Sequence, residues 1–70
     1  MTLEKWYLEK ADSVCAEAAR KYKVEYIGFK IYDNISGENI TNDIDYEDWN
    51  ISKVQAVTIE EDDVRVWVSF

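Results

Sequence analysis

The first third of the chain has the hydrophobic spacing of an amphipathic helix. Over residues 3–22, apolar side chains recur every three or four positions and fall on one side of a helical wheel. They are Leu3, Tyr7, Leu8, Ala11, Val14, Cys15, Ala18, Ala19 and Tyr22. Thr2 stands where a side-chain N-cap is expected, and Glu4 suits the positive end of the helix dipole. The pattern therefore predicts one N-terminal helix, with Trp6 off its apolar stripe.

After residue 23 the hydrophobic period changes from helical spacing to alternation, which predicts a strand over residues 24–32. One face of this strand carries Ile27, Phe29 and Ile31, and the other carries Tyr26, Gly28, Lys30 and Tyr32. Residues 33–37 are rich in turn-forming types, so we expect a turn there and a weakly patterned return strand near residues 38–42.

The C-terminal part reads as a hairpin, with strands over residues 53–60 and 64–70 around a turn at residues 61–63. Alternation in the last strand places one set of side chains inward: Val64, Val66, Val68 and Phe70. It places the other set outward: Arg65, Trp67 and Ser69. For residues 43–51 the sequence pattern fits a loop, one helical turn or an irregular strand and does not decide among them. The sequence thus predicts a single α+β domain over residues 1–70, a two-layer fold with one N-terminal helix packed on a three- or four-stranded antiparallel sheet.

Length and charge narrow the function. Seventy residues suffice for one small domain and leave no material for an internal cofactor chamber, so we expect no cofactor. The net charge is −7, and the anions are concentrated after residue 30, where ten acids face two bases. Such a field repels nucleic acid and anionic membranes, so we expect neither as a direct partner. One cysteine, no evident leader and no long apolar run predict a cytoplasmic protein.

The sequence lacks the groups that most enzymes use. It contains no histidine, and its two glycines do not form a phosphate-binding loop. Cys15 lies on the apolar stripe, where a small buried thiol is the ordinary outcome. We therefore expect a protein that is not an enzyme.

A calcium-binding loop is suggested by Asp43, Asp45 and Glu47, which alternate as the first ligands of such a loop do. The pattern then fails, because Asp48 stands where the loop needs glycine and Val54 where it needs glutamate. We expect no dedicated metal site.

Acidic side chains form the most unusual feature of the sequence, in two clusters. The first comprises Glu38, Asp43, Asp45, Glu47 and Asp48, and the second comprises Glu60, Glu61, Asp62 and Asp63. In an extended segment, alternate carboxylates repeat about every 6.6 Å, which is of the order of the phosphate spacing in a nucleic-acid strand. Together the clusters would form one negative surface able to fill a basic groove, with Tyr46 and Trp49 as apolar anchors. The alternative is that acidic turns only keep the protein soluble.

Aromatic side chains on the outer sheet face are the second candidate site. If the last strand pairs beside the first, Tyr26 and Tyr32 share this face with Trp67 and with two cations, Lys30 and Arg65. A single helix can cover only the opposite face. Exposed aromatic groups of this kind bind proteins. The alternative is that residues 43–51 cover the face, with Trp49 packed onto it.

In size, acidity and lack of catalytic groups, the chain resembles the small inhibitors that phages encode against host nucleases, including anti-CRISPR and anti-restriction proteins. The resemblance implies a binding protein that inhibits a nucleic-acid-binding protein by occluding its basic surface. The alternative function is a protein-interaction module or small homodimer that uses the aromatic outer sheet face.

Overall fold

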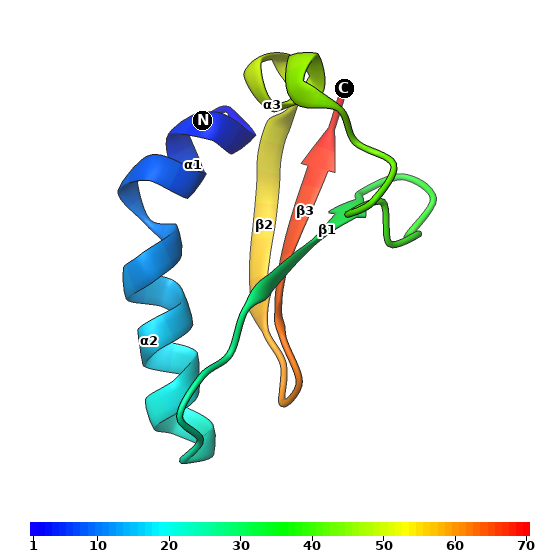
Figure 1. Cartoon of the computed structure of the whole chain (residues 1–70). Helices are drawn as coiled ribbons and strands as arrows, with labels where there is room; N and C mark the ends of the chain where they lie inside the picture. The colour runs from blue at the N-terminus through cyan, green and yellow to red at the C-terminus, as the bar shows by residue number, and fades with distance from the viewer.

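The computed structural model describes residues 1–70 and has the predicted α+β class, with helices packed on one face of a sheet (Figure 1). The helices are α1 (Leu3–Glu9), α2 (Ala11–Tyr22) and α3 (Tyr46–Ile51). The strands are β1 (Phe29–Asp33), β2 (Lys53–Ile59) and β3 (Val64–Ser69), in the spatial order β1-β3-β2. The hairpin of β2 and β3 confirms the prediction for the C-terminal part, and its turn is closed by the Glu60 amide, which donates to the Asp63 carbonyl.

The sheet is mixed, not purely antiparallel, because β1 pairs with β3 in parallel. Residues 34–52 all remain near the end of the sheet where β1 finishes, so β2 starts from that end and runs opposite to β1. The hairpin reverses the chain direction again, so β3 runs in the same direction as β1. The return strand expected near residues 38–42 is reduced to one isolated bridge between Tyr32 and Asn39.

The predicted single N-terminal helix is broken at Lys10, whose φ of −127° lies outside the helical range. The Lys10 carbonyl accepts from both the Val14 amide and the Ser13 hydroxyl, each at 3.0 Å. A serine hydroxyl that competes for a helix carbonyl is a known cause of bending. The bend turns Trp6 into the core and leaves Leu8 72% exposed, the reverse of the straight-helix prediction.

The core lies between the in-line helices and the inner face of the sheet. Its ten residues are Leu3, Trp6, Ala11, Ala18, Ala19, Ile27, Ile31, Val64, Val66 and Val68. The inward alternation predicted for β3 is confirmed for its three valines, which are fully buried. Phe70 was expected inward, but it follows the last paired residue of β3 and is exposed.

The strand predicted over residues 24–32 is shorter and shifted, because β1 begins only at Phe29. Its partner β3 begins at Val64, which pairs with Phe29, so earlier residues have no neighbouring strand. Residues 24–28 are therefore irregular. Strand alternation does not apply to Tyr26, which does not lie on the outer sheet face.

Candidate binding surfaces

The outer face of the sheet, on the side away from α1 and α2, carries an aromatic cluster. The parallel register places Tyr32 beside Trp67, with ring centroids 4.9 Å apart and the planes inclined by 40°. The Arg65 guanidinium lies 5.0 Å from the centre of the Tyr32 ring, within cation–π range. We call Tyr32, Arg65 and Trp67 the outer cluster.

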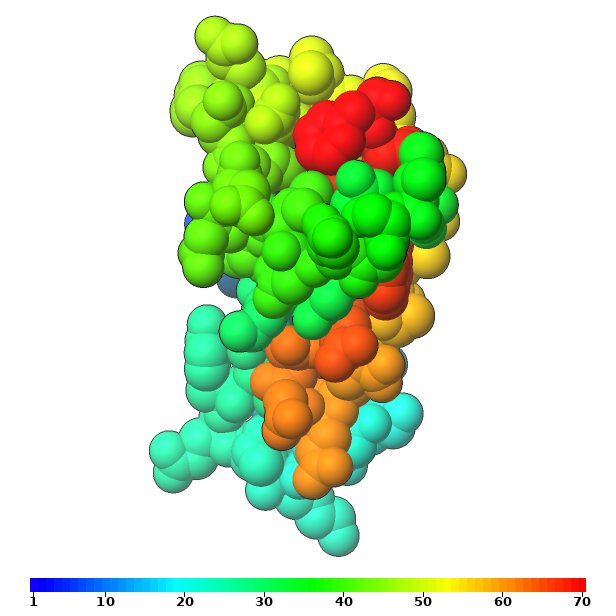
Figure 2. Space-filling view, turned by 90° about the vertical axis from the view of Figure 1, so that its right-hand side faces the viewer, coloured from blue at the N-terminus to red at the C-terminus, as the bar shows by residue number.

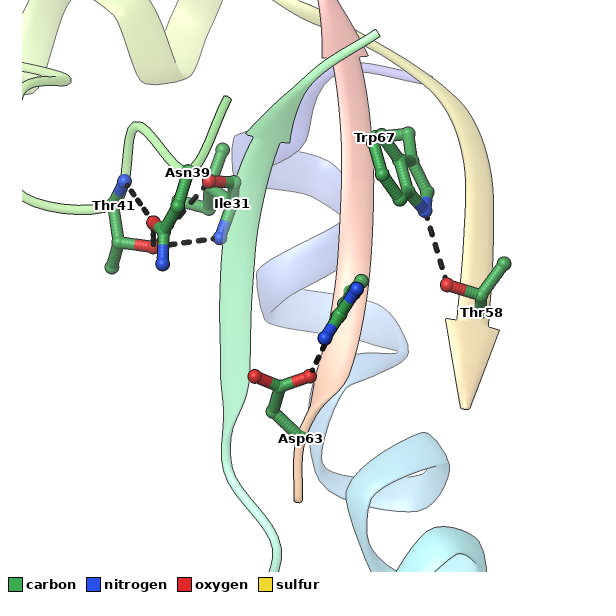
Figure 3. A network of polar contacts seen from close by, with 7 residues as sticks. Ile31, Asn39, Thr41, Thr58, Asp63 and Trp67 are labelled. Carbon is green, nitrogen blue, oxygen red and sulfur yellow. Dashed lines mark hydrogen bonds and ion pairs between the residues drawn. The ribbon is translucent and has the colours of Figure 1, made fainter. Parts of the chain in front are cut away.

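Polar partners fix the orientation of two members of the outer cluster. The Trp67 indole Nε1 donates to the Thr58 hydroxyl across the hairpin, at 3.0 Å (Figure 3). The Arg65 Nε donates to the Asp63 carboxylate at 3.1 Å, and this bond raises the pKa of the guanidinium above its ordinary value. Sequence reasoning missed Thr58, because a strand threonine resembles every other outward polar residue until the register is known.

Asp63 differs from the other predicted acidic binding residues. It is only 6% exposed and its carboxylate is occupied by Arg65, so it is withdrawn from the second acidic cluster. Glu61 and Asp62 at the hairpin turn are exposed, and Glu60 is half-buried. This end of the molecule therefore presents two exposed acids instead of four.

The two acidic clusters lie at opposite ends of β1, in the upper and lower parts of the view in Figure 2. Phe29, at one end of β1, pairs with the first residue of β3 beside the hairpin turn. At the other end of β1 the Asp33 amide donates to the Glu38 carbonyl, and four strand steps of about 3.3 Å separate these two positions. Between them, Lys30 and Arg65 are paired neighbours in the parallel register. The expected single negative surface is therefore divided by a cationic region.

The first acidic cluster is not an extended array, because residues 46–51 form α3. The Asp48 carboxylate accepts from the Asp45 amide at 3.1 Å, as in a helix capping box, which explains why this acidic segment becomes helical. Glu38, Asp43, Asp45 and Glu47 are exposed. No member of the first cluster forms an ion pair, since the two pairs in the structure join Lys5 to Glu9 and Arg65 to Asp63.

The remaining predicted aromatic residues lie on the helix side of the sheet. Trp49 packs edge-on against Tyr7 and Phe29, with centroid distances of 5.5 and 6.5 Å. The alternative in which Trp49 covers the outer face is therefore wrong, because α3 contacts α1. Tyr46 and Tyr26 are each 81% exposed.

Cys15 lies on α2 and is half-buried, and its thiol pKa is raised by burial and by the nearby Asp12 carboxylate. Both effects disfavour the reactive thiolate. No group of three or more histidine, cysteine or acidic side chains is arranged to hold a metal ion. None of the three helices combines the length and the apolar character that crossing a membrane requires.

Comparison with known proteins gives this chain no relative. No protein-family model matches it, and neither the curated proteins nor the solved structures contain a significant match. The assignment of function therefore depends on the surfaces described above.

Proposed function

We propose that this protein is a small, non-enzymatic protein-interaction module that associates with a second copy of itself through the outer sheet face. The outer cluster carries the proposal, since tryptophan, tyrosine and arginine are the residues that most often dominate binding energy at protein interfaces. α1 and α2 lie on the opposite side of the sheet (Figure 1). The unpaired cysteine suits a reducing compartment such as the cytoplasm.

The outer cluster is pre-organised for binding. Stacking, the Thr58 hydrogen bond and the Asp63 ion pair hold its three side chains in place, so association loses little side-chain entropy. Two sheets can pack face to face in this way with their strands roughly aligned. Only 12 of the 70 residues are buried in the monomer, so covering this face would add apolar burial that the small domain lacks.

The size of the face places the expected interface in the weak, transient class. Three strands of about six residues present a face of roughly 14 by 20 Å. This is smaller than a standard protein interface, so we expect a dissociation constant in the micromolar range.

Sedimentation velocity over a concentration series from about 1 µM to about 1 mM tests this proposal. We expect a monomer–dimer transition for the natural sequence and a loss of dimer for Tyr32→Ala and Trp67→Ala. Tyr46→Ala is the matched control, because it removes an exposed ring on the other side of the sheet and should leave the transition unchanged. A chain that stays monomeric throughout, or a Tyr46→Ala effect as large as that of Trp67→Ala, contradicts the proposal.

Occlusion of a basic, nucleic-acid-binding surface remains a second candidate, favoured by one observation. The carboxylates of the first acidic cluster have no cationic partner within the chain, and exposed Tyr46 lies among them in sequence. Because Lys30 and Arg65 separate the clusters, this function would use the first cluster alone.

Neutralising Asp43, Asp45, Glu47 and Asp48 together tests the second candidate. The neutralised chain should no longer inhibit a nuclease target. For the natural chain, loss of inhibition between about 50 and 200 mM salt would indicate that charge dominates the binding. The control neutralises Glu61 and Asp62, which lie at the other end of the sheet. Equal inhibition by the neutralised and natural chains contradicts this function. Circular dichroism must show α3 intact, because Asp48 caps it.

A further inference from the structure

The helix layer is only one helix wide, and this leaves part of the sheet's inner side uncovered. α1 and α2 follow one another in line and pack mainly over β2 and β3 (Figure 1). A helix about 10 Å wide spans only two strands that are about 4.8 Å apart. The helices therefore do not cover the start of β1, where Phe29 is only half-buried.

Two adjoining hollows occupy this position. The first, of about 670 Å³, is lined by Glu4, Tyr7, Leu8, Phe29, Tyr46 and Trp49. The second, of about 360 Å³, shares Tyr7 and Phe29 and continues along α2 past Asp12 and Cys15 to Glu25 and Tyr26. We call the two together the trough. It runs between α1 and α2 on one side and α3 with residues 25–29 on the other.

The trough exposes large apolar side chains. Leu8, Tyr46 and Tyr26 are 72%, 81% and 81% exposed, and all three line the trough. None of them takes part in the aromatic stacking that holds Trp49, Tyr7 and Phe29 together. A contiguous exposed apolar surface of this kind is typical of a binding groove.

The charges around the trough have one sign. Its lining includes three carboxylates, those of Glu4, Asp12 and Glu25, and no lysine or arginine. None of the three carboxylates is in an ion pair. The occupant that complements this surface is apolar on the side facing the protein and cationic at its edges.

Backbone pairing favours a helix over an extended peptide. An added strand would need the free edge of β1, but the segment after β1 already occupies that edge. The Ile31 amide donates to the Thr41 hydroxyl at 2.9 Å, and the Ile31 carbonyl accepts from Ile40 at 2.8 Å. A helix brings its own backbone hydrogen bonds and needs only an apolar seat.

We infer that the trough binds a cationic amphipathic helix from a partner protein, lying beside α1 and α2 as a second helix of the layer. From Glu4 to Ala19 the trough extends at most about 22 Å, the length of roughly fifteen helical residues. Apolar side chains spaced i, i+4, i+7 contact Leu8, Phe29 and Tyr26, while flanking lysines or arginines meet the three carboxylates. This surface lies on the opposite side of the sheet from the outer cluster, so the inference is independent of self-association.

The binding test uses three synthetic peptides of about 15 residues, long enough to fill the trough. The first has a leucine stripe at helical spacing with lysine elsewhere, the second has glutamate in place of lysine, and the third keeps the leucine and lysine content with the stripe shuffled. Titration calorimetry should show binding of the first and at least tenfold weaker binding of the other two. Circular dichroism should show a gain of helix, and alkylation of Cys15 should slow when the first peptide is bound.

Variants locate the binding surface. Leu8→Glu and Tyr46→Glu change side chains that are mostly exposed, so both should fold and bind the first peptide at least tenfold more weakly. Glu4→Gln combined with Glu25→Gln should reduce its affinity and flatten the salt dependence. The matched control is Ile35→Glu, which alters an apolar side chain 88% exposed in the turn after β1 and should leave affinity unchanged.

Four outcomes would overturn the inference. The peptides could bind equally, which would mean that only charge matters. Ile35→Glu could weaken binding as much as Leu8→Glu does, which would place the site elsewhere. The bound peptide could stay non-helical, or Leu8→Glu could abolish dimerisation of the chain alone, which would make a second copy the occupant of the trough.

Discussion

The two sides of the sheet display aromatic side chains in opposite ways. On the outer face Tyr32 contacts both Arg65 and Trp67, and each of these two has a polar partner of its own. In the trough, Tyr26, Leu8 and Tyr46 project into solvent without such contacts. The side chains of the outer cluster are held by contacts within the monomer, whereas the exposed side chains of the trough have no such contacts.

The difference has a geometric origin. A strand register places side chains directly opposite one another, so cross-strand pairs such as Tyr32 and Trp67 form whenever the strands do. No strand register fixes side-chain contacts in the trough, because the trough lies where a layer one helix wide does not cover a sheet three strands wide. Self-association through the outer cluster therefore uses side chains that are already ordered. Helix binding in the trough would instead cover the part of the sheet that α1 and α2 leave exposed.

The three tryptophans sample the core, the outer face and the trough, and a tryptophan-to-phenylalanine series should separate these environments. Trp6→Phe removes volume from a side chain that is 2% exposed and should lower the free energy of unfolding by about 1–3 kcal/mol. Trp67→Phe loses the Thr58 hydrogen bond and should cost about 1 kcal/mol. Trp49→Phe should cost least, because it keeps an aromatic ring against Tyr7 and Phe29.

Urea unfolding followed by far-ultraviolet circular dichroism measures the series without depending on tryptophan fluorescence. A cost for Trp49→Phe equal to that of Trp6→Phe would show that the trough ring belongs to the core. The core and the trough would then not differ in how tightly their aromatic side chains are packed.

The strongest local patterns in the sequence predicted the fold class. The hairpin followed from its alternation, and the three valines of β3 are buried as expected because a two-residue period admits only one inward set. The parallel pairing of β1 could not be predicted, since it depends on where nineteen residues of turn, loop and short helix place the start of β2.

Site prediction failed where the N-terminal helix is broken at Lys10. Across this break Trp6 is buried and Leu8 is exposed, which a straight-helix wheel does not predict, so the wheel did not reveal the trough. The prediction that Tyr32 and Trp67 share a face depended on the last strand pairing beside the first, and the parallel register of β1 and β3 meets that condition. Tyr26 was misplaced because it precedes the first paired residue of β1.

The Asp63–Arg65 pair offers a finer test of the difference between the two sides. Asp63→Asn removes the charge-assisted bond that orients Arg65 over Tyr32, and it leaves a largely buried amide in place of the carboxylate. We expect the thermal midpoint to fall by several degrees and dimerisation through the outer face to weaken a few-fold.

The matched control for this change is Asp62→Asn, which removes the same charge from the adjacent exposed residue and should alter neither quantity. Binding of the cationic peptide should be unaffected by both substitutions, since neither residue lines the trough. Equal effects of the two substitutions on dimerisation would mean that Asp63 acts through its charge alone. The outer cluster would then not depend on the bond to Arg65 for its pre-organisation, and the contrast between an ordered outer face and an unfilled trough would rest on ring stacking and the Thr58 bond.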